Sequence, residues 1–334
     1  MRDIAILIIS LGIILISAGF FTNGVEWLGK KMNLSEGAVG SVLAAVGTAL
    51  PETIIPLIAI FFGAGEAGHE IGIGAILGAP FMLGTLALFL SGGAVLMFRS
   101  RRADNYPRIE PDPHVLKRDL GFFLLVYTIA ISASFMNQAL KVAVIIGLIG
   151  AYIYYVYKTF TEGAGFNEEC EMDPLLLCRR HEDPPLFMVI SQVLLAFVGI
   201  VAGAKYFVGG IEHLSSSLGA SPLVIALLIA PIATEMPEKF NSVIWLSQRK
   251  DTLALGNITG AMVFQSSVIP AVGIALTPWQ LNSVALLSAA LAILSALVVY
   301  ILVRVRGYLD SRVIVCTGGL FYGGYVYAIA RGLV

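Results

Sequence analysis

Charged residues are scarce in this 334-residue chain, because Asp, Glu, Lys and Arg together make up only 13% of it. Soluble domains usually carry about 25% charged residues, so the composition excludes an ordinary water-soluble globular protein. The net charge of −1 excludes a strongly basic nucleic-acid-binding protein. Three cysteines are too few for a disulfide framework. The apolar segments contain no HExxH sequence, Ser/Lys pair or paired-aspartate motif, so we expect neither an enzyme nor a bound cofactor.

Long apolar runs dominate what is present, with 57% hydrophobic residues and a mean hydropathy of +0.86. A helix of about 20 apolar residues can cross the hydrocarbon layer of a bilayer. The first run is not followed by a small-residue cleavage site, so we interpret it as a retained span rather than a signal peptide. The sequence therefore predicts an all-α membrane protein with ten transmembrane helices, at about residues 3–23, 38–62, 70–98, 119–136, 139–158, 186–209, 221–247, 254–276, 282–303 and 311–331.

The placement of basic residues predicts the orientation of these spans. Lys and Arg gather in cytoplasmic loops of membrane proteins. With the N-terminus outside, sixteen of the 21 Lys and Arg residues fall in cytoplasmic loops, and only Arg2, Lys141 and Arg331 fall outside. Lys205 and Lys239 lie within predicted spans. We therefore expect an outside N-terminus in a multi-pass protein of the cell membrane.

Two halves of the chain resemble each other weakly. We predict a first five-helix repeat at 1–158, a cytoplasmic linker at 159–185 and a second, inverted five-helix repeat at 186–334, since an odd number of spans inverts the next repeat. The matching segments are 24–26 with 210–212, 48–52 with 234–238, and the glycine-containing 74–78 with 256–260. The glycines predict close helix packing. In the linker, Cys170, Cys178 and His181 match no zinc template, so a solvated acidic linker is favoured over a metal site.

Two glutamates, Glu52 and Glu238, lie deep within apolar spans at matching positions of the two repeats. A carboxylate at the bilayer centre costs about 3 kcal/mol on insertion scales, so it persists only in a polar cavity, beside a cation or in protonated form. Thr48 and Thr234 lie four residues earlier, where each hydroxyl shares a helix face with its carboxylate. The repetition favours a cation site over a protonated structural glutamate.

A proline directly precedes each of these glutamates. Pro51 and Pro237 cannot donate a backbone hydrogen bond, so each helix is predicted to break just before its glutamate. Carbonyl groups freed at such breaks are hard oxygen ligands, which suit Na⁺ or Ca²⁺. The alternative is that both prolines only kink their helices.

The motifs carry a family resemblance. Residues 47–52 read GTALPE and residues 233–238 read ATEMPE, followed by GAILGAPFMLG and GNITGAMVFQS. Over essentially its whole length the chain resembles the sodium/calcium exchanger (cation/Ca²⁺ antiporter) family of prokaryotic type, whose repeats carry GTSLPE. The resemblance implies a secondary antiporter with alternating access in a prokaryotic plasma membrane. It also implies that Glu52 and Glu238 are the central cation ligands, with Thr48 and Thr234 beside them.

The motifs depart from the family pattern, mainly in the first copy. The family's serine after the threonine is Ala49 in the first copy and Glu235 in the second. The further amide or acid ligand of the family is Leu83 in the first copy and Gln265 in the second. We therefore expect polar ligands mostly in the second copy, and the predicted cation ligands are Glu52, Glu238, Thr48, Thr234, Glu235 and Gln265.

The identity of the exchanged ions stays open at this point. Lys239 adjoins Glu238 and lies four residues after Glu235, so it could neutralise a site carboxylate and stand in for one Na⁺. Exchange of Na⁺ for Ca²⁺ is the leading hypothesis, and H⁺-coupled exchange of Ca²⁺ or another cation is the second. A degenerate membrane sensor or scaffold that does not transport is the third. We expect the lipid bilayer and the transported ions as partners, no nucleic acid, and a monomer or loose homo-oligomer.

Overall fold

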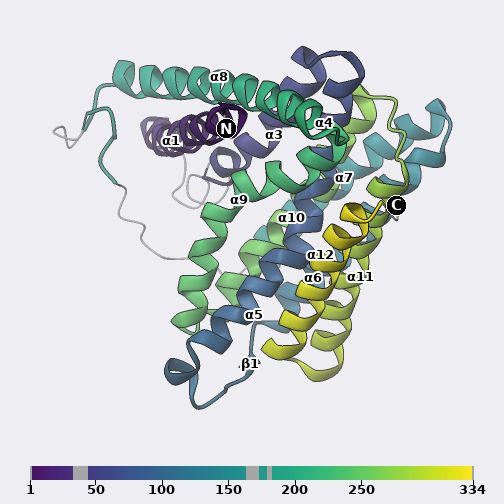
Figure 1. Cartoon of the computed structure of the whole chain (residues 1–334). Helices are drawn as coiled ribbons and strands as arrows, with labels where there is room; N and C mark the ends of the chain where they lie inside the picture. Colours follow the sequence, from purple (N-terminus) through teal and green to yellow (C-terminus); the bar gives the residue numbers. More distant parts are fainter. Residues whose placement is uncertain (1, 33–43, 163–172, 179–182, 333–334) are drawn as a thin grey trace. The chain divides into compact units, whose positions relative to one another are not determined.

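The computed structural model describes residues 2–32, 44–162, 173–178 and 183–332, which are almost entirely helical (Figure 1). The described chain divides into two compact units. Unit 1 contains residues 1–72 and 157–222, and unit 2 contains residues 73–156 and 223–334. Each unit contains helices from both predicted repeats. The boundaries of the packed units therefore differ from the boundaries of the sequence repeats.

Unit 1 is built on two long helices, α1 (Arg2–Lys31) and α8 (Leu186–Leu218), which lie side by side. Glycines bring them close: a Cβ on Gly203 would lie 2.7 Å from the side chain of Ile14, and one on Gly210 would lie 2.9 Å from Leu7. A Cβ on Gly24 would lie 2.8 Å from Val193, at the opposite end of the pair. The residue numbers of the contacting positions fall along α1 as they rise along α8, so the two helices are antiparallel. The helix α3 (Ala44–Phe62) packs on both.

A short piece of the predicted linker docks on this pair of helices. The indole Nε1 of Trp27 donates to the carbonyl of Asp173 at 3.0 Å, and Oε1 of Gln192 accepts from the backbone N–H of Leu177 at 2.7 Å. Between them, the side chain of Leu175 is fully buried. Cys170 and His181 of the considered metal site lie outside the described residues.

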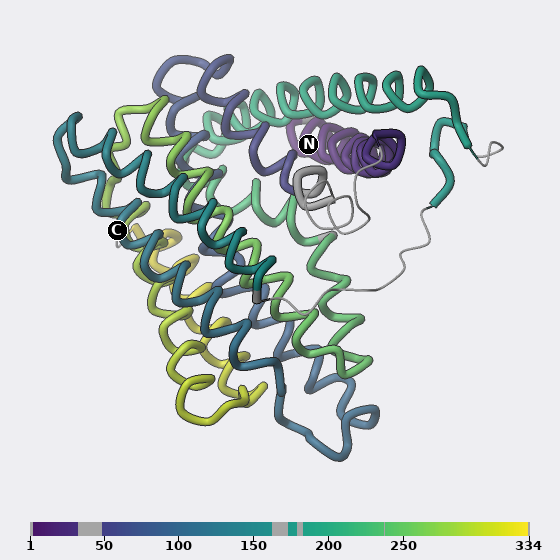
Figure 2. Tube along the Cα trace, turned by 180° about the vertical axis from the view of Figure 1, so that it is seen from behind, coloured from purple at the N-terminus to yellow at the C-terminus, as the bar shows by residue number. Residues whose placement is uncertain are grey.

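Unit 2 contains the remaining helices. They are the second part of α4 (Gly65–Met82), a π-helical turn (Leu83–Ala87), α5 (Leu88–Met97), α6 (Pro113–Ser132), α7 (Gln138–Glu162) up to residue 156, α9 (Pro222–Ser247) from residue 223, α10 (Asp251–Leu276), α11 (Ser283–Arg306) and α12 (Ser311–Ala330). The helix α6 packs on α10 and α11, and α12 packs on α5 and α11. Two short strands, β1 (Arg108–Ile109) and β2 (Leu309–Asp310), pair antiparallel. Figure 2 shows the α11–α12 hairpin in yellow-green from behind.

Local sequence explains where several of these helices begin and end. Asp112 caps α6 by accepting from the N–H of His114, and Pro113 occupies the first helical position, where no N–H is needed. Asn282 caps α11 in the same way, and Gly307 ends it with a φ of 73°, a conformation that favours glycine. Asp310 then caps α12 through the N–H of Arg312.

Seven helices among the described residues are long and apolar enough to cross a membrane, and α3 and α9 contain shorter apolar segments. The ten predicted spans each fall on a helical segment where the structure describes them, but ten crossings and an outside N-terminus stay predictions. The expected helix breaks at Pro51 and Pro237 are wrong, because α3 and α9 run through both residues. A single missing N–H removes one helical hydrogen bond, and membrane helices accommodate that loss.

Candidate functional site

Four of the polar residues predicted to matter lie on two turns of α9 in unit 2. Glu235 is 0% exposed, Lys239 is 3% exposed and Thr234 is 6% exposed. The Thr234 hydroxyl donates to the carbonyl of Ala230, four residues earlier, at 3.1 Å. The side chain of Glu238 retains 32% of its exposure. A five-residue segment of this apolar helix therefore carries two carboxyl groups and one ammonium group.

The ammonium of Lys239 lies beside Glu238. Its Nζ is 3.7 Å from Oε2 of Glu238, close enough for an ion pair. Glu235, four residues before Lys239, is a second candidate partner from its spacing, and that pairing stays a prediction. The buried ammonium therefore lies beside a carboxylate whose side chain is partly exposed.

The helix α10 supplies a buried amide. Gln265 is 2% exposed, and its Oε1 accepts no hydrogen bond from the described residues. A buried acceptor without a donor costs about 1–3 kcal/mol, so its retention points to a ligand. Ser266 and Ser267, by contrast, donate to the carbonyl of Val263 within their own helix.

Hydrogen bonds near the turn of the α9–α10 hairpin show which residues of the two helices lie side by side. Ser242 donates to the carbonyl of Ala254 at 3.1 Å, and Nδ2 of Asn257 lies 3.4 Å from the Ser242 hydroxyl. Two helical turns from this contact lead to Thr234 and Glu235 on α9, and to Gln265 on α10. The buried carboxyl and the buried amide therefore lie at the same level of the hairpin.

The first copy of the motif is poorer in oxygen ligands. Glu52 lies on α3 in unit 1 and is half-buried, whereas the side chain of Thr48 is outside the described part of the structure. Leu83, which corresponds to Gln265, is a fully buried apolar residue in unit 2. It begins the π-helical turn Leu83–Ala87, whose Gly84 carbonyl accepts from the Ser295 hydroxyl. The expected imbalance in ligands between the two copies stays a prediction.

Glycines of the first copy allow α4 to approach α9. A Cβ on Gly74 would lie 2.4 Å from the carbonyl oxygen of Leu223, and one on Gly78 would lie 2.3 Å from that of Leu227. Pro231 has no N–H to donate to the Leu227 carbonyl, which leaves this oxygen facing Gly78. The predicted close packing is confirmed here, directly before the polar turns of α9.

A buried carboxylate that the sequence reading missed holds another face of α10. Asp119, on α6, is 1% exposed and accepts from the Thr259 hydroxyl at 2.8 Å and from the Tyr155 hydroxyl at 3.0 Å. The guanidinium of Arg118 also donates to it, at 3.0 Å. Thr259 is six residues before Gln265, so this bond helps to fix the rotation of α10. The sequence feature that could have indicated this cluster is the position of Asp119 at the start of a predicted span.

A second missed group ties the α9–α10 turn to the connection between α5 and α6. Arg102 is fully buried and pairs in bidentate fashion with Asp251, at 2.6 and 2.7 Å. It also donates to the carbonyl of Leu246, while the N–H of Glu110 donates to Asp251. The turn that joins the two site helices is thus held by a buried, bidentate ion pair.

The described residues contain no group of three or more His, Cys, Asp or Glu side chains that could hold a metal ion. The family model for the sodium/calcium exchanger protein matches residues 3–161 and 188–331, nearly the whole chain. The chain belongs to the sodium/calcium exchanger family. It is therefore a multi-span membrane protein of a transporter family.

Other exchangers and their relatives match over similar lengths. CaxA of Alkalimonas amylolytica, a protein named as a candidate antiporter, is 25% identical over 334 residues, which cover 98% of each chain. The crystal structure of the H⁺/Ca²⁺ exchanger CAX superposes with a TM-score of 0.73 at 13% identity, covering 98% of this chain and 82% of that one. The sodium-calcium exchanger NCX_Mj gives a TM-score of 0.56 at 20% identity, covering 99% and 98%. At these identities the two structures establish a shared fold.

Proposed function

We propose that this exchanger-family protein is a secondary antiporter that moves Ca²⁺ against a monovalent cation by alternating access. The observation that carries the proposal lies on the α9–α10 hairpin. The buried Glu235 and the Oε1 of Gln265, which accepts no hydrogen bond from the described residues, each lie about two helical turns from the Ser242–Asn257 contact. Glu238 and Thr234 complete the polar segment of α9. Carboxylate, amide and hydroxyl oxygens are the ligands that Ca²⁺ and Na⁺ prefer.

The proposal gives Glu52 the role in the first repeat that Glu238 has in the second. Glu52 and Glu238 follow the same motif in α3 and α9, and the antiparallel arrangement of α1 and α8 within unit 1 supports an inverted repeat. Three carboxylates (Glu52, Glu235 and Glu238) and one ammonium (Lys239) have a formal charge of −2. One Ca²⁺ or two monovalent cations would balance that charge.

Exchange against H⁺ is the second candidate. Lys239 favours it, because a resident ammonium beside Glu238 leaves less negative charge for several Na⁺ ions at once. Two protons on carboxyl groups satisfy the same charge balance as two Na⁺ ions and need no further oxygen ligands.

Ion flux into proteoliposomes tests the proposal. Uptake of ⁴⁵Ca²⁺ by the purified full chain is measured with an outward Na⁺ gradient and, separately, with an outward H⁺ gradient. We expect uptake that requires one of the two gradients and is abolished in Glu52→Gln and Glu238→Gln. A ⁴⁵Ca²⁺ signal that neither gradient and neither substitution changes would overturn the transporter assignment, and would favour a sensor or scaffold.

A further inference from the structure

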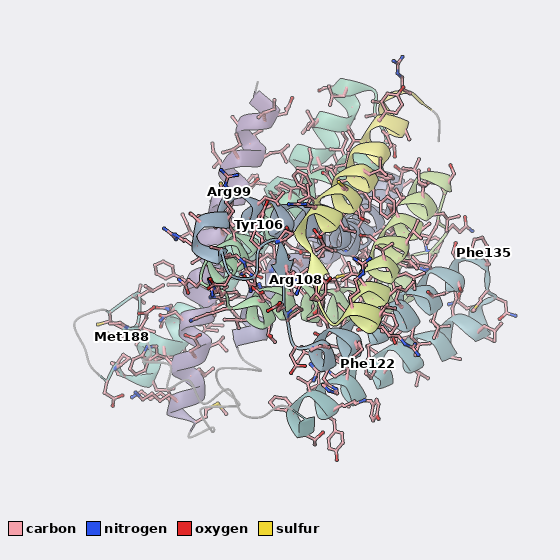
Figure 3. The ribbon with its side chains drawn as sticks, turned by 90° about the horizontal axis from the view of Figure 1, so that it is seen from below. Arg99, Tyr106, Arg108, Phe122, Phe135 and Met188 are labelled. Atoms are coloured by element: carbon pink, nitrogen blue, oxygen red, sulfur yellow. The ribbon has the colours of Figure 1, made fainter. Side chains whose placement is uncertain are left out.

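Two connections at one end of unit 2 pair through short β-strands. The connection between α5 and α6 contains β1, and the connection between α11 and α12 contains β2, with Arg108 opposite Asp310 in the antiparallel register. The N–H of Ser311 donates to the carbonyl of Pro107 at 3.0 Å. Figure 3 shows Tyr106 and Arg108 on this end of the molecule, seen from below.

Two arginines, Arg108 on β1 and Arg312 in the first turn of α12, each lie over a tyrosine across this pair of strands. The guanidinium of Arg108 is 4.6 Å from the ring centre of Tyr308, and that of Arg312 is 5.7 Å from the ring centre of Tyr106. Both arginines are exposed, and neither forms an ion pair with another described residue. Stacking fixes the plane of a guanidinium while its N–H donors stay available, an arrangement suited to binding phosphate.

Further positive charge adjoins the two stacked arginines. Arg304 and Arg306 are exposed in the last turn of α11, directly before β2. Two acids, Glu110 and Asp310, lie on the same paired strands or next to them, and Asp310 is engaged in capping α12. Four arginines and two carboxylates leave this cluster with a formal charge of +2.

An exposed apolar stripe leads along α11 to the same arginines. Leu294, Leu297, Ile301 and Val305 follow each other at helical spacing and are 45%, 38%, 48% and 76% exposed. Val305 stands between Arg304 and Arg306 in the sequence. A basic cluster at the end of an apolar stripe matches the two parts of a phospholipid, its headgroup and its acyl chain.

We propose that this end of unit 2 binds an anionic phospholipid. Arg108 and Arg312 hold the headgroup phosphate from their stacked positions, Arg304 and Arg306 add positive charge, and an acyl chain lies along the α11 stripe. Free phosphate would use only the arginines and leave the stripe uncovered. The distribution of Lys and Arg predicts that this end faces the cytoplasm, where anionic lipids attract basic clusters next to transmembrane helices. The inference is independent of which ions the protein exchanges.

Native mass spectrometry of the full chain in micelles tests the proposal, with phosphatidylglycerol and phosphatidylcholine added in equal amounts. We expect the wild type to retain more phosphatidylglycerol than phosphatidylcholine. In Arg108→Gln/Arg312→Gln, this preference for phosphatidylglycerol should fall about fivefold for each arginine replaced. Arg304→Gln/Arg306→Gln, which leaves the paired strands intact, is expected to lower it in the same direction. Thermal unfolding without added lipid checks that each variant is folded.

Arg99→Gln/Lys250→Gln is the matched control, because both side chains are exposed and lie outside the stacked pairs. This variant is expected to keep the preference of the wild type. An equal loss in the control would overturn the site in favour of general surface charge. Equal retention of the two lipids by the wild type, or displacement of phosphatidylglycerol by millimolar inorganic phosphate, would also overturn it.

Discussion

The Nζ of Lys239 lies 3.7 Å from Oε2 of Glu238, the residue before it on α9. A buried ammonium next to a partly exposed carboxylate lowers the negative charge that mobile cations must balance. We therefore expect this side chain to perform part of the charge compensation that ions would otherwise supply.

Lys239→Ala removes that positive charge and should change the coupling ratio. We expect the number of monovalent cations exchanged per Ca²⁺ to rise by about one, because the carboxylates must then be balanced by mobile ions. Reversal potentials in proteoliposomes measure the ratio. Lys205→Ala, at an exposed lysine of α8, is the control, and an identical ratio in wild type and Lys239→Ala would contradict the charge-balance argument.

Gln265→Leu separates cation binding from stability. Because Oε1 of Gln265 has no hydrogen-bond donor among the described residues, its removal should leave thermal unfolding unchanged or raise its midpoint. The apparent affinity for Ca²⁺ should fall roughly tenfold, as expected for the loss of an oxygen that contacts a charged group. Ser267→Ala, whose hydroxyl already donates within α10, should leave affinity unaltered. Loss of stability with unchanged affinity would assign Gln265 a structural role.

Asp119→Ala tests the contact between α6 and α10. The substitution leaves the Arg118 guanidinium, 11% exposed, without its acceptor, and removes the partner of Thr259. We expect a loss of about 3 kcal/mol in the free energy of unfolding. Asp119→Asn keeps an acceptor oxygen and should lose less. Equal stability of Asp119→Ala and the wild type would show that the cluster does not hold α10.

Two ion pairs on the same connection provide a matched comparison of burial. Arg102–Asp251 has side chains that are 0% and 4% exposed, whereas Arg249–Asp104 has side chains that are 43% and 80% exposed. Asp251→Ala should cost about 3–5 kcal/mol, because it leaves a buried guanidinium unpaired. Asp104→Ala should cost less than about 1 kcal/mol, because water screens an exposed pair. Unfolding in detergent measures both, and similar losses would contradict the burial argument.

Glycines at matching repeat positions should differ in tolerance. An added Cβ on Gly78 would lie 2.3 Å from the Leu227 carbonyl oxygen, whereas one on Gly260 would lie 3.7 Å from the Tyr155 hydroxyl. Gly78→Ala should therefore cost about 1–3 kcal/mol through overpacking, and Gly260→Ala should be nearly neutral. Unfolding midpoints of the two variants give the test, and equal effects would exclude the α4–α9 contact as the cause.

The sequence by itself determined the class of the protein, the helices and the family. Apolar runs set where the helices form, because backbone groups in a bilayer must be paired within each helix. Repeated motifs predicted Glu52 and Glu238 as site residues, and the departures from these motifs indicated that the second copy retains more polar side chains. These features depend on local composition and spacing, which can be read along the chain.

Only the tertiary structure decided which groups meet. Asp119 finds Thr259 and Tyr155 on two other helices, and Arg102 finds Asp251 across about 150 residues of chain. It also showed that α3 and α9 continue through Pro51 and Pro237, and that Lys239 pairs with Glu238. The physical reason is that burial and rotation of a helix come from its neighbours in space. A side chain therefore becomes a ligand, a structural anchor or a lipid contact only when those neighbours are in place.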